Sequence, residues 1–263
     1  MITSVRNPKV QEVRALQQRA KKRRKAGAFV VEGVRLAEEA LNAEWTVRQI
    51  FYTEDLSERG RQVMRELKKR GAAEESVSSS VMEAMSDTES PQGLLLEVGE
   101  REIAIPRQLD LVLILDKVSD PGNLGTLLRS AVAAGCQAAL LTEGSADPFS
   151  PKVLRSGMGA QFTLPIQEMA WSEIAEFCKQ HRLNVFVTEL SEGQPYNEAD
   201  LTHSLAFVIG GEARGVSEEA KRMDARPIHI PMAGEIESLN AAIAGSILLF
   251  EALRQRRAAE KHL

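Results

Sequence analysis

Three short segments in the C-terminal half of the chain carry polar side chains where an apolar strand gives way to a helix. They are Asp120-Pro-Gly-Asn-Leu-Gly-Thr-Leu-Leu-Arg129, Ile209-Gly-Gly-Glu-Ala-Arg-Gly215, and the pair Ile230-Pro-Met232 and Ser238-Leu-Asn240. The free N–H groups and the dipole at a helix N-terminus favour small polar ligands. Open α/β sheets bind ligands where their strands end, so three such segments in one domain predict a composite site.

Each polar side chain in these segments has a structural and a chemical interpretation. Asn123 suits an N-cap, because the helix is expected to begin at or just after it. Arg129, on the second turn, is either an exposed charge or a donor aimed at a phosphate or a reacting hydroxyl. Glu212 could bind a ligand amine or hydroxyl, or could cap the helix that follows it. Ser238 and Asn240 are likewise candidate helix caps or ligand contacts.

The glycines of these segments do not complete a familiar nucleotide-binding motif. Gly210 to Gly215 has the spacing that begins a phosphate loop, but Val216 stands where that loop requires lysine. Gly122-Asn-Leu-Gly125 lacks the spacing of the dinucleotide fingerprint. The sequence therefore predicts neither nucleoside triphosphate hydrolysis nor hydride transfer.

The composition is that of an ordinary globular protein. Of 263 residues, 43% are hydrophobic and 27% charged, and no apolar run reaches the ~20 residues of a membrane span. The basic N-terminus lacks the apolar core of a secretory signal, so we expect a cytoplasmic protein. Cys136 and Cys178 form no C-x-x-C pair, which predicts neither a disulfide framework nor a zinc site. Cys136 lies in an apolar stretch and is expected to be a core residue, not a thiolate nucleophile for pyrimidine methylation.

The net charge of −4 argues weakly against nucleic-acid binding, but the distribution of charge argues for it. Residues 1–25 carry nine basic side chains against one acidic side chain, Glu12. Phosphate binding depends on local cation density more than on net charge. This segment is therefore either a nucleic-acid contact or a solvated basic terminus.

Apolar periodicity predicts two α/β domains, residues 1–100 and 106–263, with a break that contains Pro106. For the first domain the expected helices are 7–18, 32–41 and 58–70, and the expected strands are 29–31, 50–52 and 94–96. For the second, the expected strands are 111–115, 138–141, 185–187 and 206–209, and the helices are 124–134, 150–157 and 171–181. Apolar strands alternating with helices imply a mostly parallel sheet covered on both faces.

The three polar segments resemble the motifs of a known family, the SpoU (TrmH-type) branch of the SPOUT superfamily of RNA ribose 2′-O-methyltransferases. Its N-x-G-x-x-x-R motif corresponds to Asn123, Gly125 and Arg129, and its Gly-Glu loop corresponds to residues 210–215. Its I-P-M and S-L-N motifs correspond to residues 230–232 and 238–240. All three motifs occur in order over about residues 108–257, and residues 150–159 resemble the stretch between the first two. One departure is mild: Ala241-Ala-Ile243 stands where the family often has Val-Ser-Val.

The resemblance implies a deep trefoil knot, a homodimer, and bent S-adenosylmethionine held by the knotted loops. Arg129 would stabilise and position the reacting hydroxyl, with Asn123, Glu212, Ser238 and Asn240 positioning substrate and cofactor. The implied cofactor contacts are Thr188, Ile209, Gly210, Gly211, Glu212, Gly215, Ile230, Met232, Ser238 and Leu239, with Glu189 and Thr142 as weaker candidates. His229 is expected to be structural. The expected RNA contacts are Arg23, Arg24, Lys25, Arg129 and Arg155.

The N-terminal domain is similar to a ribosomal-protein-like α/β module that many family members carry to bind their substrate. Val31-Glu-Gly33 before an apolar helix looks like its opening signature. Such modules recognise folded RNA by shape and backbone, which favours large-subunit ribosomal RNA as the substrate. Three alternatives stay open: a transfer-RNA 2′-O-methyltransferase, a non-catalytic RNA-binding or ribosome-assembly factor, and a methylase that confers ribosome-directed antibiotic resistance.

Overall fold

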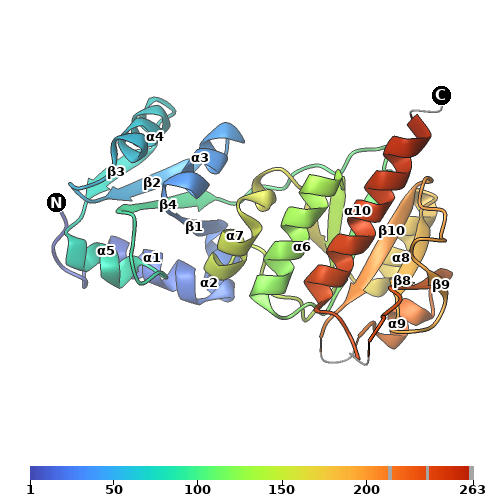
Figure 1. Ribbon diagram of the computed structural model, residues 1–263. Coiled ribbons are helices and arrows are strands. Elements are labelled where there is room, and N and C mark those ends of the chain that lie inside the picture. Colours follow the sequence, from blue (N-terminus) through green and yellow to red (C-terminus); the bar gives the residue numbers. More distant parts are fainter. Residues whose placement is uncertain (213–214, 235–236, 261–263) are drawn as a thin grey trace. The chain divides into compact units, whose positions relative to one another are not determined.

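The computed structural model describes residues 1–212, 215–234 and 237–260 (Figure 1). The chain divides into two compact units, Met1–Glu102 with Phe149–Phe162, and Ile103–Pro148 with Thr163–Leu263. Residues 149–162 fall, by sequence, inside the range expected for the C-terminal domain, yet they pack with the N-terminal unit. The chain therefore passes from one unit to the other three times. In the part of the chain that is described, no helix combines the length and the apolar character that crossing a membrane requires.

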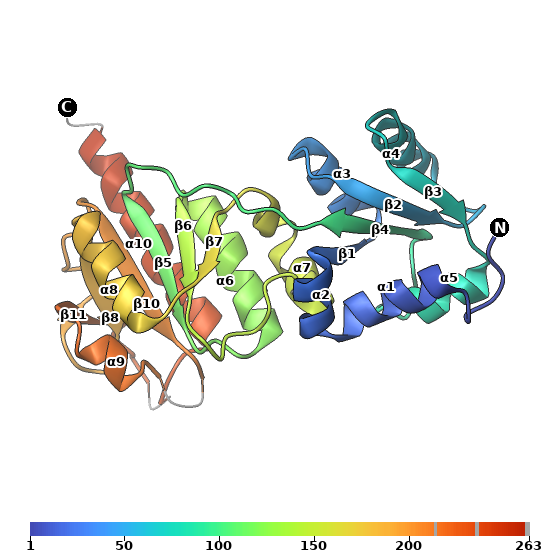
Figure 2. The same ribbon diagram turned by 180° about the vertical axis from the view of Figure 1, so that it is seen from behind.

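The N-terminal unit is a four-stranded sheet with helices on both faces (Figure 2). The strand order is β1-β4-β2-β3, in which only the β2–β3 pair is parallel. The strands are β1 (Ala28–Glu32), β2 (Val47–Tyr52), β3 (Ala73–Ser76) and β4 (Leu94–Gly99). The helices are α1 (Pro8–Gln18), α2 (Ala20–Ala26), α3 (Val34–Asn42), α4 (Glu58–Lys69), α5 (Ser79–Met85), α7 (Pro151–Gly157) and the 3-10 helix η1 (Ala160–Phe162).

Apolar side chains of α1 and α5 cover one face of this sheet. Val10, Val13 and Leu16 of α1 are buried together with Met82 of α5 and Phe51 of β2. The strands expected at 29–31, 50–52 and 94–96 are confirmed. The strand β3 and the helices α2 and α5 of this unit were not predicted from the sequence. The four residues of β3 read Ala-Glu-Glu-Ser at the sheet edge, and such a polar edge strand lacks the apolar alternation that marks a strand in sequence.

An aromatic cluster holds residues 149–162 within the N-terminal unit. The Phe29 and Phe149 rings lie 4.7 Å apart between centroids, and Trp45 meets the edge of Phe162 at 5.4 Å. The Trp45 indole N–H also donates a hydrogen bond to the Phe162 carbonyl at 3.0 Å. Buried aromatic pairs with a satisfied indole N–H are strong packing contacts, so this segment belongs structurally to the unit that it packs with.

The C-terminal unit is a seven-stranded sheet whose strand pairs, among the described residues, are all parallel. The strand order is β7-β6-β5-β10-β8-β11-β9. The strands are β5 (Leu111–Asp116), β6 (Ala138–Leu141), β7 (Ile166–Glu168), β8 (Asn184–Thr188), β9 (Gln194–Pro195), β10 (Leu205–Gly210) and β11 (Ala225–His229). The helices are α6 (Pro121–Ala134), α8 (Trp171–Gln180), α9 (Glu218–Lys221) and α10 (Ala241–Glu260). The expected α/β class with a mostly parallel sheet is confirmed.

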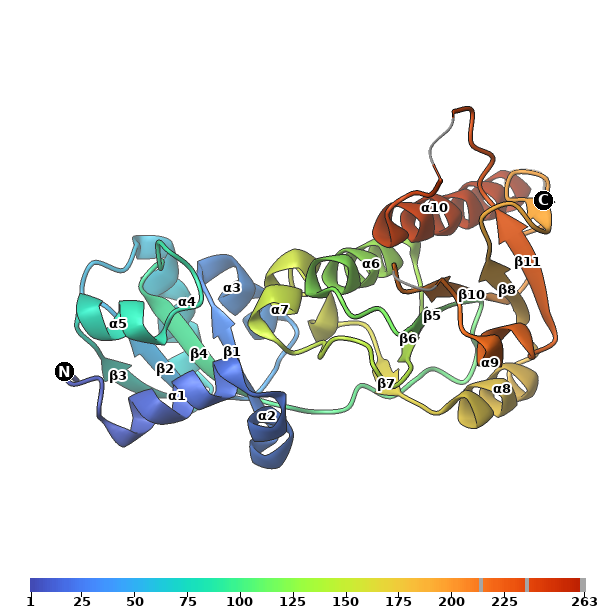
Figure 3. The same cartoon turned by 90° about the horizontal axis from the view of Figure 1, so that it is seen from below.

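Helices cover both faces of this second sheet: α6 and α10 lie on one side, and α8 and α9 lie on the other (Figure 3). Every residue of the central strands β5 and β10 is buried, which explains their continuous apolar sequences. In the β5–β10 register Gly210 pairs with Asp116, so the ends of these strands lie side by side. The strand-end segments predicted to meet therefore begin from neighbouring positions.

Gly245 allows α10 to pack closely on α6 and β10. A Cβ atom at this position would lie 2.4 Å from Leu127 Cδ2 and 3.3 Å from Ile209 Cγ1. Such distances leave no space for a side chain without repacking. The trefoil knot implied by the family resemblance would lie in the C-terminal part of the chain, which includes residues 210–240. Because part of that stretch lies outside the described residues, the knot stays an expectation.

Candidate active site

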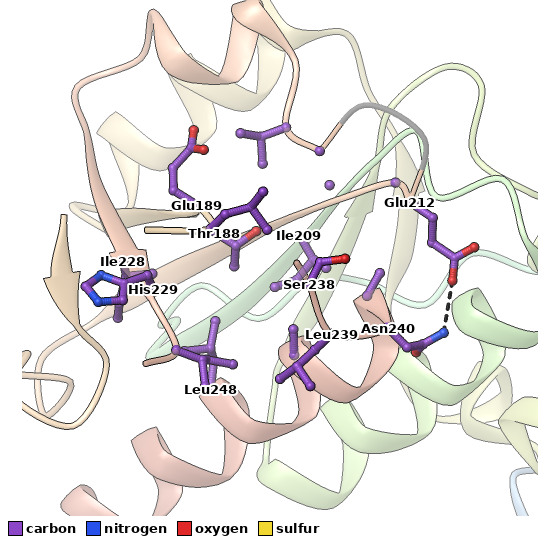
Figure 4. A pocket seen from close by; sticks show the side chains of 18 of the residues that line it. Thr188, Glu189, Ile209, Glu212, Ile228, His229, Ser238, Leu239, Asn240 and Leu248 are labelled. Atoms are coloured by element: carbon purple, nitrogen blue, oxygen red, sulfur yellow. Dashed lines mark hydrogen bonds between the residues drawn. The ribbon is translucent and has the colours of Figure 1, made fainter. Parts of the chain in front are cut away.

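A cavity of about 510 Å³ lies where the carboxyl ends of β8, β10 and β11 meet the start of α10 (Figure 4). All ten residues predicted to contact a cofactor line it: Thr188, Ile209, Gly210, Gly211, Glu212, Gly215, Ile230, Met232, Ser238 and Leu239. The volume falls within the ~300–1,000 Å³ typical of small-molecule sites. The fold thus brings all these residues to one cavity, and their contact with a cofactor stays a prediction.

Three side chains from the three predicted segments meet at one edge of the cavity. The Asn240 amide Nδ2 donates hydrogen bonds to Glu212 Oε1 and to Asn123 Oδ1, both at 2.9 Å. Asn123 Nδ2 also donates to Glu212 Oε1. Figure 4 shows the Glu212 and Asn240 side chains directed toward each other from the loop and the helix. Two amides therefore orient a carboxylate at the cavity edge.

Asn240 is confirmed as a helix cap, and it makes these contacts in addition. Its Oδ1 accepts hydrogen bonds from the N–H groups of Ala242 at 2.9 Å and Ile243 at 3.2 Å. These are two of the orphan donors at the start of α10. The cap fixes the amide plane, and the fixed plane directs Nδ2 toward Glu212.

Two other candidate caps, Asn123 and Glu212, do not cap their helices. The α6 helix begins at Pro121, three residues earlier than expected, and Asp120 caps it by accepting from the Asn123 N–H at 2.8 Å. Asn123 is thereby inside the first turn, where its side chain is available to Glu212. Glu212 does not cap the following helix either, because Ser217 caps α9. Both corrections have one cause: an Asp or a Ser directly before the helix satisfies its N–H groups first.

Arg129 lies apart from this cluster. It is exposed on α6, about 9 Å along the helix axis from Asn123 at 1.5 Å per residue, and it does not line the cavity. Within residues 1–212, 215–234 and 237–260, no hydrogen bond or ion pair engages its guanidinium. The arrangement leaves this cation open to a second reactant that approaches from outside the cavity.

The cavity wall includes charged residues that the sequence analysis missed. Lys221 of α9 forms an ion pair with Glu189 at 3.3 Å. The Lys221 ammonium also donates a hydrogen bond to this carboxylate, which raises the pKa of Lys221. Glu189 is one of the weaker candidates from the sequence, whereas Lys221 carries no signal there, being one charge in a polar stretch. His229, expected to be structural, also lines the cavity, and its buried Nδ1 has no hydrogen-bond partner among the described residues.

The lining suits a molecule that combines an apolar ring with a cationic centre. Ile209, Leu239 and Leu248 form apolar walls, and three glycines of the lining leave room beside them. The Glu212 carboxylate favours positive charge, whereas Glu189 is paired with Lys221. An adenine, a ribose and a sulfonium therefore fit the chemistry of these residues.

Two of the expected RNA contacts have partners within the protein. Arg23 is 5% exposed and donates to the main-chain carbonyls of Leu16 at 2.5 Å and Gln17 at 2.9 Å. Its expected RNA role is therefore wrong in this structure: α2 turns the side chain inward to cap the end of α1. Arg155 pairs with Asp87 at 2.6 Å within the N-terminal unit. Arg24 and Lys25 are exposed, as an RNA contact requires.

Cys136 is a core residue, as expected. Its side chain is buried in the C-terminal unit, and burial raises the pKa of the thiol well above its usual range. A thiol that stays protonated is a poor nucleophile. The structure thus gives no support to a cysteine-based methylation mechanism at this position.

Each of the two units matches a known protein family. The SpoU rRNA Methylase family matches residues 110–250, and the MRM3-like substrate binding domain matches residues 7–96. The 23S rRNA (guanosine(2553)-2'-O)-methyltransferase RlmP of Bacillus subtilis (strain 168) is 33% identical over 251 residues, covering 95% of this chain and 97% of the relative. The 23S rRNA (uridine(2479)-2'-O)-methyltransferase of Streptomyces viridochromogenes is 32% identical, covering 97% and 92%.

A solved structure shares the whole architecture. The crystal structure of the SpoU methyltransferase AviRb from Streptomyces viridochromogenes, in complex with the cofactor AdoMet, has a TM-score of 0.89 and 29% identity, covering 96% of this chain and 99% of that one. The family match spans more than half of the sequence, and the relatives align along nearly all of it. The chain belongs to the SpoU rRNA methylase family.

Proposed function

We propose that this protein transfers a methyl group from S-adenosylmethionine to a ribose 2′-hydroxyl of large-subunit ribosomal RNA. The observation that carries the proposal is the meeting of Asn123, Glu212 and Asn240 at the edge of a cavity lined by the family's motif loops. The relatives named as 23S rRNA 2'-O-methyltransferases support the choice of RNA. Residues 1–100 would bind the RNA and residues 106–263 would carry the chemistry, in line with the two family matches.

The chain's residues would divide the work between binding and activation. S-adenosylmethionine supplies an electrophilic methyl group on a sulfonium. The cavity walls would orient the cofactor, with Glu212 held in place by the two asparagines. A ribose hydroxyl is a weak nucleophile unless a base or a positive neighbour assists it. Arginine is a hydrogen-bond donor without an acceptor, so we assign Arg129 to electrostatic stabilisation of the developing oxyanion, with the hydroxyl proton passing to water.

We further propose that the protein acts as a homodimer. Val132 of α6 is 39% exposed, and Ile243 and Phe250 of α10 are 53% and 47% exposed. These apolar side chains lie on the two helices that cover one face of the C-terminal sheet (Figure 3). A second copy of the chain packed on these helices would remove the three side chains from water, and burial of apolar surface favours association. A location in the cytoplasm stays a prediction.

The substrate assignment is tested with labelled S-adenosylmethionine, unmodified ribosomal RNA and transfer RNA. We expect label in an alkali-resistant dinucleotide from the large-subunit RNA, because ribose methylation blocks the 2′-hydroxyl that alkaline cleavage needs. Label from transfer RNA instead would select that alternative. Cofactor binding without label in either RNA would point to an assembling subunit as substrate, and absence of cofactor binding would favour the non-catalytic alternative.

Replacing Arg129 with alanine should lower methyl transfer by about 100-fold or more, the usual cost of removing one charge-stabilising donor. The affinity for S-adenosylmethionine should change little, because Arg129 does not line the cavity. Single-turnover rates and calorimetric cofactor titration measure the two quantities. Arg257→Ala, at an exposed arginine on the last turns of α10, is the matched control. Near-normal turnover in Arg129→Ala would refute the role.

Replacing Asn240 with aspartate should weaken cofactor binding near neutral pH and restore part of it at lower pH. The change keeps the helix cap, since Asn and Asp cap about equally well. It also places a carboxylate where Nδ2 now donates to Glu212. Two ionised carboxylates repel each other, and protonation of the pair at low pH relieves the repulsion. Cofactor titration from pH 5 to pH 8 should show the recovery, whereas Asn240→Ser, a neutral cap, should show none.

The RNA-binding role of α2 is tested by point substitution. Deleting residues 1–25 would remove the buried α1 side chains Val10, Val13 and Leu16, so it would damage the fold. Arg24→Ala with Lys25→Ala should weaken RNA binding and lower the salt slope by about 0.7–0.9 for each phosphate that is no longer neutralised. The control pair is Arg65→Ala with Lys69→Ala on α4, which removes the same charge from the same unit. If both pairs weakened RNA binding equally, the loss of net positive charge, and not the α2 surface, would explain the effect.

A further inference from the structure

The Gly-Glu loop, residues 210–215, and the turn into α9 that follows it are attached to the sheet by one residue that does not line the cavity. Asp116 ends β5 and is fully buried. Its main-chain carbonyl accepts a hydrogen bond from the Gly211 N–H at 2.9 Å. Its carboxylate Oδ2 accepts another from the Ser217 N–H at 2.6 Å. One residue therefore holds both the entry and the exit of the loop.

Close backbone approach restricts the described ends of the loop near these two attachments. A Cβ atom on Gly211 would lie 2.4 Å from the Lys117 carbonyl oxygen, and one on Gly210 would lie 2.2 Å from the Gly215 carbonyl carbon. The Gly215 N–H also donates to the Gly211 carbonyl at 3.0 Å. Glycine is required where main chain packs against main chain in this way, so the loop's path depends on its packing against the ends of the strands.

The other oxygen of the Asp116 carboxylate has a partner as well. Thr142, which follows β6, donates through its hydroxyl to Asp116 Oδ1 at 3.2 Å and accepts from the Lys117 N–H at 2.9 Å. Thr142 is 4% exposed and lies outside the cavity lining, so its weak candidacy as a cofactor contact is not supported. Buried carboxylates are costly unless hydrogen-bonded, and here both oxygens are engaged.

We propose that Asp116 is a positioning residue for the cofactor, whose carboxylate holds the C-terminal end of the Gly-Glu loop at the cavity wall through the Ser217 N–H. The inference rests on the proposed function, which assigns the cofactor to this cavity. Gly211, Glu212 and Gly215 of the held loop form part of the cavity wall. The Glu212 carboxylate has separate partners on α6 and next to α10. Loss of the Asp116 hydrogen bond should therefore impair cofactor affinity more than the rate at saturating cofactor.

The first test compares Asp116→Ala with Asp116→Asn. Asparagine can accept from the Ser217 N–H and donate to the Thr142 hydroxyl oxygen, while that hydroxyl turns toward the Leu115 carbonyl, 3.5 Å away. Asp116→Ala should raise the calorimetric Kd and the KM for S-adenosylmethionine by about tenfold or more, as loss of a buried acceptor implies, with kcat within about threefold. Asp116→Asn should keep Kd within about threefold of the wild type. Asp110→Ala, at the other end of β5, is the control and should leave Kd unchanged.

A second pair of variants isolates the hydrogen-bond donor. Ser217 has φ −73°, a value that proline adopts, so Ser217→Pro deletes the N–H without forcing the backbone at this residue. Ser217→Ala removes the same hydroxyl, which caps α9, but keeps the N–H. Ser217→Pro should raise the cofactor Kd as Asp116→Ala does, and Ser217→Ala should not. If Asp116→Ala does not fold, the cofactor Kd values of the two Ser217 variants and of Asp116→Asn still test the proposal.

Three results would overturn the inference: wild-type affinity in Asp116→Ala, equal effects of Asp116→Ala and Asp116→Asn, or equal effects of the two Ser217 variants. The second result would assign the effect to charge and not to the hydrogen-bond acceptor. A wild-type protein that does not bind S-adenosylmethionine would instead overturn the proposed function itself. The failures of the two proposals are therefore distinguishable.

Discussion

The candidate active site depends on one amide side chain that satisfies two elements at once. Asn240 Oδ1 accepts from the first N–H groups of α10, and its Nδ2 donates to Asn123 and Glu212. Aspartate or serine could cap the helix as well, but an ionised aspartate has no donor, and a serine hydroxyl has a single O–H that could not donate to both Asn123 and Glu212. The requirement for an amide at this position follows from that geometry. The start of α10, the first turn of α6 and the Gly-Glu loop are thereby fixed relative to one another.

The parallel sheet supplies the setting in which this contact can form. Neighbouring strands β5 and β10 end at paired residues, so the segments that leave them start side by side. Gly245 then lets α10 lie close against α6 and β10, which brings Asn240 within hydrogen-bond distance of Asn123. Sites carried by rigid elements hold their geometry better than sites on free loops. The Gly-Glu loop fits this pattern, because Asp116 attaches both of its ends to the sheet.

The basic N-terminal segment shows how packing assigns different tasks to similar residues. Arg23, Arg24 and Lys25 are adjacent in sequence and equivalent in composition. The helical structure is interrupted at Arg19, between α1 and α2. The new direction of α2 turns Arg23 toward the end of α1. A buried guanidinium with carbonyl partners stabilises a helix junction, whereas its two neighbours are exposed at the surface. Local charge density identified the segment, and helix geometry decided which of its cations are exposed.

The sequence by itself determined the α/β class, the central strands and the three polar segments, because apolar periodicity and turn residues are local properties. It also placed Asn240 as a cap. The caps Asp120 and Ser217 are also local features, since each accepts from an N–H three residues further on, but they were not predicted. The sequence did not identify the partners of Thr142 and Asp116, or Lys221 in the cavity wall. Those assignments depend on which atoms meet across separations of up to about a hundred residues. Only the tertiary structure decides them, since hydrogen-bond partners are chosen by distance and direction in the folded chain.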